Sequence, residues 1–359
     1  MKKIAVLCSG GVDSSVALSL LKDKKDNDIT VFYLKIWLED ELHYLGECPW
    51  EEDLAIVKKT CNALGVNLEI IPLQREYWKK VVEKSISLIK TGYTPNPDMF
   101  CNSTIKFGSF FDFYGKNFEN IATGHYAKKI EEDGWSYLAL CSDKKKDQTY
   151  FLAHTNYERI QKVIFPLQSF ENKEAVRKYA FEKKLPAATR KDSQGICFLG
   201  KISFAEFIKY HCGVKNGALI DYETNAILGQ HNGFWFFTIG QRQGIGLSGG
   251  PFYVVKKDIE NNIVFVSRKK PNELFLTNIE ILLCYLNFLV SKNFYPKVGE
   301  VYIVKLRHGE QTNQVLVLEM NLDSMRVQLL FPDQGVARGQ FMVFYTKDRK
   351  CLGSGMIVE

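Results

Sequence analysis

The sequence contains no segment that could cross or enter a membrane. No apolar run among its 359 residues approaches the roughly 18 residues that a membrane helix needs. The apolar stretch 4–8 ends at Ser9-Gly10-Gly11. It is too short for the hydrophobic region of a signal peptide, which has about 7–15 residues. We therefore expect a cytoplasmic protein with no membrane partner.

The nine cysteines form no C-x-x-C pair. This absence excludes zinc ribbons and thioredoxin-like redox motifs, and we predict no metal site built from protein ligands. The odd count and irregular spacing also disfavour a disulfide scaffold. We expect most of these cysteines to behave as small buried hydrophobic residues.

No strong excess of either charge is present. The net charge of +6 is spread as +2, +3 and +1 over residues 1–200, 201–275 and 276–359. An excess this thin does not by itself indicate a nucleic-acid partner, and we expect no DNA binding. With 46% hydrophobic and 25% charged residues the chain is ordinary and globular, and its length predicts two or three domains.

Strands and helices alternate over the first half of the chain. Apolar runs rich in branched and aromatic residues predict strands at 4–7, 29–36, 66–73 and 121–124. Apolar residues at helical spacing predict helices at 14–25, 51–64, 75–90 and 105–114. This alternation predicts an α/β domain over residues 1–200, with a parallel sheet and flanking helices.

The pattern changes after residue 200. One short helix is predicted at 203–210, followed by β-like runs at 235–239, 252–255 and 263–267. We expect a small, mostly β central α+β domain over 201–275. Five further runs at roughly 12-residue spacing predict a small barrel or sandwich over 276–359; they lie at 301–306, 314–319, 325–331, 340–345 and 353–358.

The string S-G-G-V-D-S-S follows the first strand and begins the first helix. Consecutive glycines let a backbone approach a phosphate closely, and the N–H groups of the following helix point at the same place. Asp13 is a candidate to orient the loop or a magnesium ion. A capped strand-to-helix turn is the alternative interpretation. The lysine of a Walker A motif is missing, which excludes a P-loop NTPase.

Two other segments each contain a candidate reactive cysteine. The prolines of segment 93–102 exclude a helix until about Met99, which sets Cys101 near the start of the next helix. The helix dipole there favours a thiolate, and Asp98 is a candidate base. Cys197 lies in segment 190–200, where Lys191 is placed to stabilise a thiolate. Taken singly, each segment is better explained as an ordinary loop with a buried cysteine.

Two shorter strings stand at places where ligands bind. Thr123-Gly124-His125-Tyr126 ends a predicted strand, at the edge where open parallel sheets bind ligands. The other string is Lys146-Asp147-Gln148-Thr149-Tyr150-Phe151. The alternative interpretation of the first string is a buried structural histidine, and that of the second string is a solvent-exposed helix start.

In this order, the strings resemble the bacterial tRNA-specific 2-thiouridylases, a family of PP-loop ATP pyrophosphatases that thiolate the wobble uridine of tRNA. The resemblance runs nearly end to end. It covers S-G-G-V-D-S-S, T-P-N-P-D-x-x-C-N, T-G-H-Y, K-D-Q-x-Y-F-L, D-S-x-G-I-C-F and, at residues 237–246, F-x-T-I-G-Q-R-Q-G-x-G. The P-N-P-D-x-x-C and G-I-C-F strings are specific to this family.

The resemblance implies a role for each matching position. ATP, with Mg²⁺ bound through its phosphates, would contact the end of the first strand, the loop after it and two later positions in the chain. These residues are Leu7, Cys8, Ser9, Gly10, Gly11, Val12, Asp13, Ser14, Leu34 and Gly124. The target base would contact Asn96, Pro97 and Asp98. Other parts of the tRNA would contact His125, Lys146, Asp147 and Gln148, and, in a C-terminal β-barrel, Arg307, His308 and Gln340.

The family's chemistry also implies two reactive thiols. Cys197 would carry a persulfide, supplied by a sulfur-donor protein or relay, and Cys101 would be its partner nucleophile. The uridine 2-oxygen would first be adenylated with release of pyrophosphate. Persulfide sulfur would then displace AMP, leaving a Cys101–Cys197 disulfide to be reduced.

The chain departs from the family pattern at a few positions. Leu34-Lys35-Ile36-Trp37 replaces the usual M-K-N-W, and His308 stands where Tyr is common. Other PP-loop enzymes are the nearest alternative class, but amide-forming ligases, argininosuccinate-type synthetases and lysidine-type tRNA ligases need no pair of thiols. A non-catalytic RNA-binding protein has no need of an intact phosphate loop.

Overall fold

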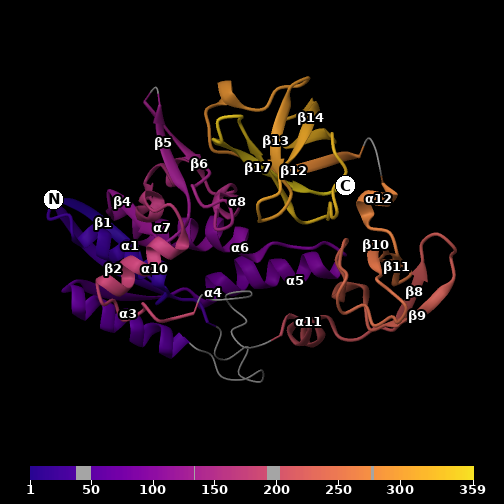
Figure 1. The fold of residues 1–359 in the computed structure, drawn as a ribbon, viewed down its shortest axis with the longest axis horizontal. Coiled ribbons are helices and arrows are strands. Elements are labelled where there is room, and N and C mark those ends of the chain that lie inside the picture. Colours follow the sequence, from indigo (N-terminus) through magenta and orange to yellow (C-terminus); the bar gives the residue numbers. More distant parts are fainter. Residues whose placement is uncertain (38–49, 133, 192–202, 276–278) are drawn as a thin grey trace.

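The computed structural model describes residues 1–37, 50–132, 134–191, 203–275 and 279–359 (Figure 1). Five parallel strands form the N-terminal sheet, in the order β3-β2-β1-β4-β7. Their bounds are β1 Lys2–Leu7, β2 Asn27–Lys35, β3 Asn67–Pro72, β4 Asn120–Thr123 and β7 Val163–Ile164. From β1 the chain adds β2 and β3 on one side, and it then returns to add β4 and β7 on the other side of β1. The carboxyl ends of β1 and β4 therefore form a switch point, where ligands bind in open parallel sheets.

Side chains alternate across this sheet, so each face has its own helices. Ile4 and Val6 pack against Leu18 of helix α1 and Leu54 of helix α3. The opposite face, with Ala5, Leu7 and Phe32, packs against the helical segments between β3 and β4. The helices outside those segments are α1 Val12–Lys22, α3 Trp50–Leu64, α8 Thr149–Leu152, α9 Tyr157–Gln161 and α10 Lys173–Glu182, with short turns at Gly115–Asn117 and Pro166–Ser169.

The two helices predicted between β3 and β4 are each composite. The first comprises α4 Gln74–Tyr77, a π-helical turn Trp78–Val82 and α5 Glu83–Lys90. The second comprises α6 Pro97–Phe100, a π-helical segment Cys101–Ser109 and α7 Phe110–Phe113. The expectation that the prolines exclude helix until about Met99 was wrong. Asn96 caps the helix by accepting from the Met99 N–H, and Pro97 occupies the first helical turn, where it loses no hydrogen bond.

The central domain has one helix and a four-stranded sheet in the order β10-β11-β8-β9. The elements are α11 Phe204–Cys212, β8 Gly217–Asp221, β9 Ile227–His231, β10 Tyr253–Asp258, β11 Ile263–Ser267 and α12 Pro271–Leu274. The strand predicted at 235–239 is wrong, because the chain forms a 3₁₀ turn at Phe234–Phe236. Phe234 and Phe237 enter the domain core from this turn, so burial comes from aromatic packing and not from strand alternation.

The C-terminal domain is a closed six-stranded barrel in the order β12-β15-β14-β13-β16-β17. Its strands are β12 Glu280–Phe288, β13 Val301–Lys305, β14 Asn313–Met320, β15 Ser324–Leu329, β16 Phe341–Tyr345 and β17 Cys351–Ile357, with a short turn at Lys292–Phe294. Strand β12 was missed because its apolar residues run continuously in sequence. It pairs with both β15 and β17 and so closes the barrel.

The barrel packs directly on the N-terminal domain. Phe341 and Tyr345 of β16 belong to the same apolar cluster as Phe100 and Tyr150. A hairpin of β5 Lys128–Glu132 and β6 Trp135–Ala139 adds a backbone bridge from Ala139 to Lys350 (Figure 1). Within the described ranges, no helix is long and apolar enough to span a membrane.

Barrel closure depends on Gly353, where a Cβ would lie 2.1 Å from the Asn287 carbonyl oxygen. We expect Gly353→Ala to destabilise the protein by about 3 kcal/mol, by separating β17 from β12. Gly299 is the matched control, because it also has positive φ but has open space around it. Gly299→Ala should cost only about 1–2 kcal/mol. Urea unfolding followed by tryptophan fluorescence measures both, and equal losses would contradict the steric explanation.

Candidate active site

The phosphate loop connects β1 to α1 and is held by its own serines. Ser14 Oγ donates to the Gly11 carbonyl at 3.0 Å and accepts from the Ser9 N–H at 3.3 Å. Gly10 has φ of +82°, a conformation that glycine adopts without strain. The N-cap of α1 is Gly11, which has no side chain to cap the first turn. The loop therefore directs backbone donors outward with the helix dipole behind them, as an anion site requires.

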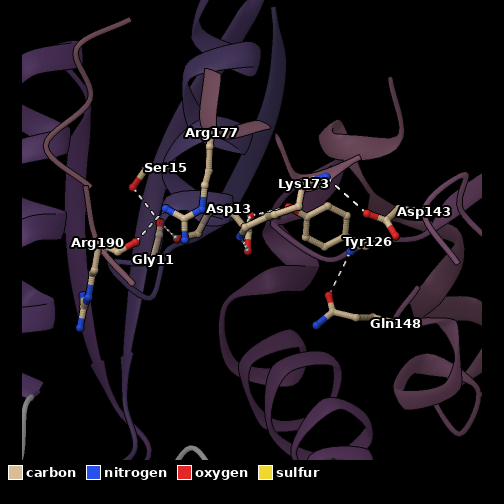
Figure 2. Close-up of polar contacts among 10 residues, drawn as sticks. Gly11, Asp13, Ser15, Tyr126, Asp143, Gln148, Lys173, Arg177 and Arg190 are labelled. Carbon is tan, nitrogen blue, oxygen red and sulfur yellow. Dashed lines mark hydrogen bonds and ion pairs between the residues drawn. The ribbon is translucent and has the colours of Figure 1, made fainter. Parts of the chain in front are cut away.

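Asp13 is bound by two side chains from distant parts of the chain (Figure 2). Lys173 Nζ lies 2.7 and 2.8 Å from its two carboxylate oxygens, and Tyr126 Oη donates to Oδ1 at 2.6 Å. Lys173 is 7% exposed, so its charge is nearly removed from water and paired. Sequence reasoning missed Lys173, because it stands in an ordinary helical stretch with no motif around it.

Gly124 lies directly against the phosphate loop. A Cβ there would approach the Ser14 nitrogen at 2.6 Å and the Asp13 carbonyl carbon at 2.7 Å. The predicted proximity of the T-G-H-Y string to the loop is thus present, since β4 is the neighbour of β1. Leu34 lies near the carboxyl end of β2, on the other side of β1, and is half-buried.

Arg190 supports the other side of the loop. Its guanidinium donates to the Gly10 carbonyl at 3.1 Å and pairs with Asp53 of α3. Arg177 of α10 donates in turn to the Arg190 carbonyl at 3.0 Å (Figure 2). Sequence reasoning assigned no role to these three charged residues, and Arg190 and Asp53 are far apart along the chain.

The P-N-P-D segment forms a helix start that contacts the barrel. Gln340 Nε2 donates to the Thr94 carbonyl at 2.9 Å and the Pro95 carbonyl at 3.3 Å, and Asn96 Nδ2 lies 3.5 Å from its Oε1. Gln340 therefore joins the barrel to this segment. Asp98 follows in the first helical turn and is half-buried.

Burial raises the pKa of Asp98 above its ordinary value, and the nearby positive charges of Lys106 and His308 partly oppose the rise. A carboxylate with a raised pKa is a stronger base once it is ionised. The pKa of His308 reflects the same interaction with Asp98. The pKa of His308 is lowered, mainly by burial and by Lys305, and the carboxylates of Asp147 and Asp98 oppose that shift.

Cys101 is 3% exposed and lies in the second turn of the same helical segment as Asp98. Cys197 lies outside the described residues, so the predicted pairing of the two thiols stays a prediction. Burial raises the pKa of Cys61 to about 11 and of Cys141 and Cys351 to about 12. Those three thiols are therefore protonated at neutral pH.

The predicted tRNA contacts on the catalytic domain differ in exposure. His125 is half-buried, is hydrogen-bonded to Thr123 Oγ1 at 2.8 Å, and has a pKa well below its usual value, chiefly through burial. Gln148 accepts from the Tyr126 N–H at 3.0 Å (Figure 2). The Lys146 N–H donates to Asp143 Oδ1 at 3.2 Å. Asp147 is 1% exposed, so its carboxylate faces the protein interior.

On the barrel, Arg307 and His308 follow β13. Arg307 Nη2 pairs with Asp333 Oδ1 at 2.6 Å. The His308 ring lies 4.7 Å from the Phe151 ring. Across the described ranges, no group of three or more His, Cys, Asp or Glu side chains is arranged to hold a metal ion.

Three family models match consecutive parts of the chain. They are the tRNA methyl transferase HUP domain over residues 2–201, the tRNA methyl transferase PRC-barrel domain over 205–268, and the aminomethyltransferase beta-barrel domain over 280–357. The chain is 45% identical to the tRNA-specific 2-thiouridylase MnmA of Parabacteroides distasonis, over 99% of both chains. It is 42% identical to MnmA 1 of Bacteroides thetaiotaomicron and 41% to MnmA of Porphyromonas gingivalis, again over 99% of each.

The chain belongs to the tRNA-specific 2-thiouridylase family. The predicted fold class is confirmed: a parallel-sheet HUP domain is followed by a β-rich central domain and a six-stranded barrel. Our division into residues 1–200, 201–275 and 276–359 remains a proposal for the domain boundaries. In this chain, Gln340 joins the barrel to the segment before Asp98, and Tyr126 joins Asp13 of the phosphate loop to Gln148.

The packing of Gly124 yields a test of the nucleotide site. We expect Gly124→Ala to displace Asp13 and Ser14 and to weaken ATP binding by about tenfold or more, equal to about 1.4 kcal/mol. Isothermal titration with ATP measures the effect. Gly65→Ala is the control, because a Cβ at Gly65 has open space and the residue is remote from the loop in sequence. Unchanged ATP affinity in Gly124→Ala would remove Gly124 from the nucleotide site.

Proposed function

We propose that this chain thiolates the wobble uridine of tRNA at its 2-position, in two steps that consume ATP. The observation that carries the proposal is that Leu7, which leads into the phosphate loop, and Cys101 of the Asp98–Cys101 helix start lie in one apolar cluster, while Gln340 of the barrel hydrogen-bonds to the segment before that helix. The relatives named 2-thiouridylase match over their full length, which supports the same activity here.

ATP fits the loop on two grounds. The uncapped start of α1 and the positive φ of Gly10 leave backbone donors for phosphate oxygens, and Gly124 allows the loop to lie close to β4. We propose nucleotide contacts from the residues between Leu7 and Ser14, from Leu34 and from Gly124. Mg²⁺ bound through the ATP phosphates would supply charge neutralisation for the leaving pyrophosphate.

In the first step, the uridine 2-oxygen attacks the α-phosphorus, and the bond to the pyrophosphate leaving group breaks. A carbonyl oxygen is a poor leaving group, and adenylation converts it into one that departs as AMP. Asn96, Pro97 and Asp98 are our candidates for holding the base. His125, Lys146, Asp147, Gln148, Arg307, His308 and Gln340 are our candidates for contacts to the rest of the tRNA, direct or through their neighbours.

In the second step, the outer sulfur of a Cys197 persulfide attacks C2 of the adenylated base, and AMP leaves with the original oxygen. Asp98 accepts the persulfide proton. Cys101 thiolate attacks the inner sulfur as the persulfide bond breaks, so the two cysteines end as a disulfide. An external thiol reduces that disulfide, and a persulfide-bearing donor protein or relay reloads Cys197.

Sulfur incorporation into tRNA tests this sequence. Purified protein with tRNA, ATP, Mg²⁺ and sulfide should form 2-thiouridine, and Cys101→Ser and Cys197→Ser should each lose nearly all of it. Cys61→Ser, a buried thiol outside the loop, is the matched control and should retain activity. Full activity in both thiol variants would refute the persulfide route. ATP–pyrophosphate exchange that ignores tRNA would indicate a ligase for a small substrate.

The raised pKa of Asp98 predicts an acid limb in the sulfur-transfer rate. The base form exists only above that pKa, so the rate is full at higher pH and falls as the pH drops through it. We expect Asp98→Asn to lower the single-turnover rate by roughly 10²–10⁴-fold and to flatten this limb. Rapid-quench measurements of the sulfur-transfer rate between pH 4 and 8, for the wild type and for Asp98→Asn, test both expectations. An acid limb that persists unchanged in Asp98→Asn would exclude Asp98 as the base.

A further inference from the structure

The K-D-Q-T-Y-F segment is a joint between the catalytic domain and the barrel. Thr149 Oγ1 hydrogen-bonds to Tyr345 Oη at 3.0 Å. Tyr150 is fully buried, and its hydroxyl lies 3.0 Å from the Phe341 carbonyl and 3.4 Å from the Leu306 carbonyl. The side chains of Thr149 and Tyr150 therefore contact β16 and the residue that follows β13.

An ion pair lies at the centre of this joint. Lys305 Nζ of β13 lies 3.4 Å from Asp147 Oδ1, and the two side chains are 4% and 1% exposed. Asp147 also accepts from the Thr149 hydroxyl at 2.6 Å and from the Cys141 N–H at 2.8 Å. Its carboxylate is thus fixed by its own domain, and it presents one charge to the barrel.

A buried ion pair resists separation of its partners. A buried carboxylate that loses its ammonium partner is left with an uncompensated charge, which is strongly destabilising. The barrel can therefore shift along this contact only by breaking the pair. Lys305 is at the end of β13, two residues before Arg307 and three before His308.

We propose that Lys305 is a positioning residue, whose ion pair with Asp147 sets the barrel in the register that holds His308 near Asp98. The proposal rests on the function proposed above. It assigns the Asp of the K-D-Q string to alignment of the barrel, and through the barrel to alignment of the tRNA. A misalignment of about 1 Å in a reacting complex lowers the rate on the order of 100-fold.

Three variants of the full-length protein test the assignment. Lys305→Met removes the charge and keeps an apolar stem of similar length, while Lys305→Arg restores a cation. Lys350→Met is the matched control, because Lys350 also joins the barrel to the catalytic domain, through Glu132, but that partner is 49% exposed. For each variant, ATP affinity, kcat at saturating tRNA and the KM for tRNA are measured below its melting temperature.

We expect Lys305→Met to lower kcat on the order of 100-fold with ATP affinity unchanged. Lys305→Arg should recover most of that loss, and Lys350→Met should stay within about twofold of wild type, because the Glu132 carboxylate that it leaves unpaired is half exposed to water. A folded Lys305→Met with wild-type kcat would overturn the proposal. Equal losses of ATP affinity and kcat would overturn it too, because they assign Lys305 to general stability. Absence of thiolation by the wild-type protein would instead refute the proposed function.

Discussion

The site depends on one close approach, between the end of β4 and the phosphate loop that follows β1. Parallel pairing of these two strands brings Gly124 against Asp13 and Ser14, with no space for a side chain between them. Because the chain leaves β1 and β4 in opposite directions, the sheet opens at their carboxyl ends. The loop donors, the start of α1 and Tyr126 all meet at this opening.

Charges hold the loop from both sides of that approach. Lys173 and Tyr126 bind Asp13, while Arg190 binds the Gly10 carbonyl and Asp53. These contacts occupy the Asp13 carboxylate in the structure, which supports the interpretation that Asp13 orients the loop. Gln148 continues the network from Tyr126 toward the barrel joint. Asp147, Thr149 and Tyr150, the chain neighbours of Gln148, make the contacts to the barrel.

Local patterns predicted elements well where periodicity and burial agree. The strand at β1, the helix at α3 and the barrel strands at β13 and β14 were found within one or two residues, since each is marked in sequence by an apolar run or by apolar residues at helical spacing. The central domain was harder. Its aromatic run at 234–237 mimics a strand in sequence, but its rings fill a core around a glycine with φ of +143°. Strand β12 was missed because no alternation marked it.

By itself, the sequence determined the fold class, the phosphate loop and the family, because these depend on short strings whose spacing is set by local geometry. Only the tertiary structure decided which partners those strings have. Lys173, Arg190 and Lys305 are ordinary lysines and arginines in sequence, and each acquires its role from a carboxylate more than 100 positions away. Asp147 shows most clearly how the role implied by the sequence and the place given by folding can differ. The family resemblance implies a tRNA contact at its string, and folding places the Asp147 carboxylate against the barrel, since long-range packing and not local sequence determines burial.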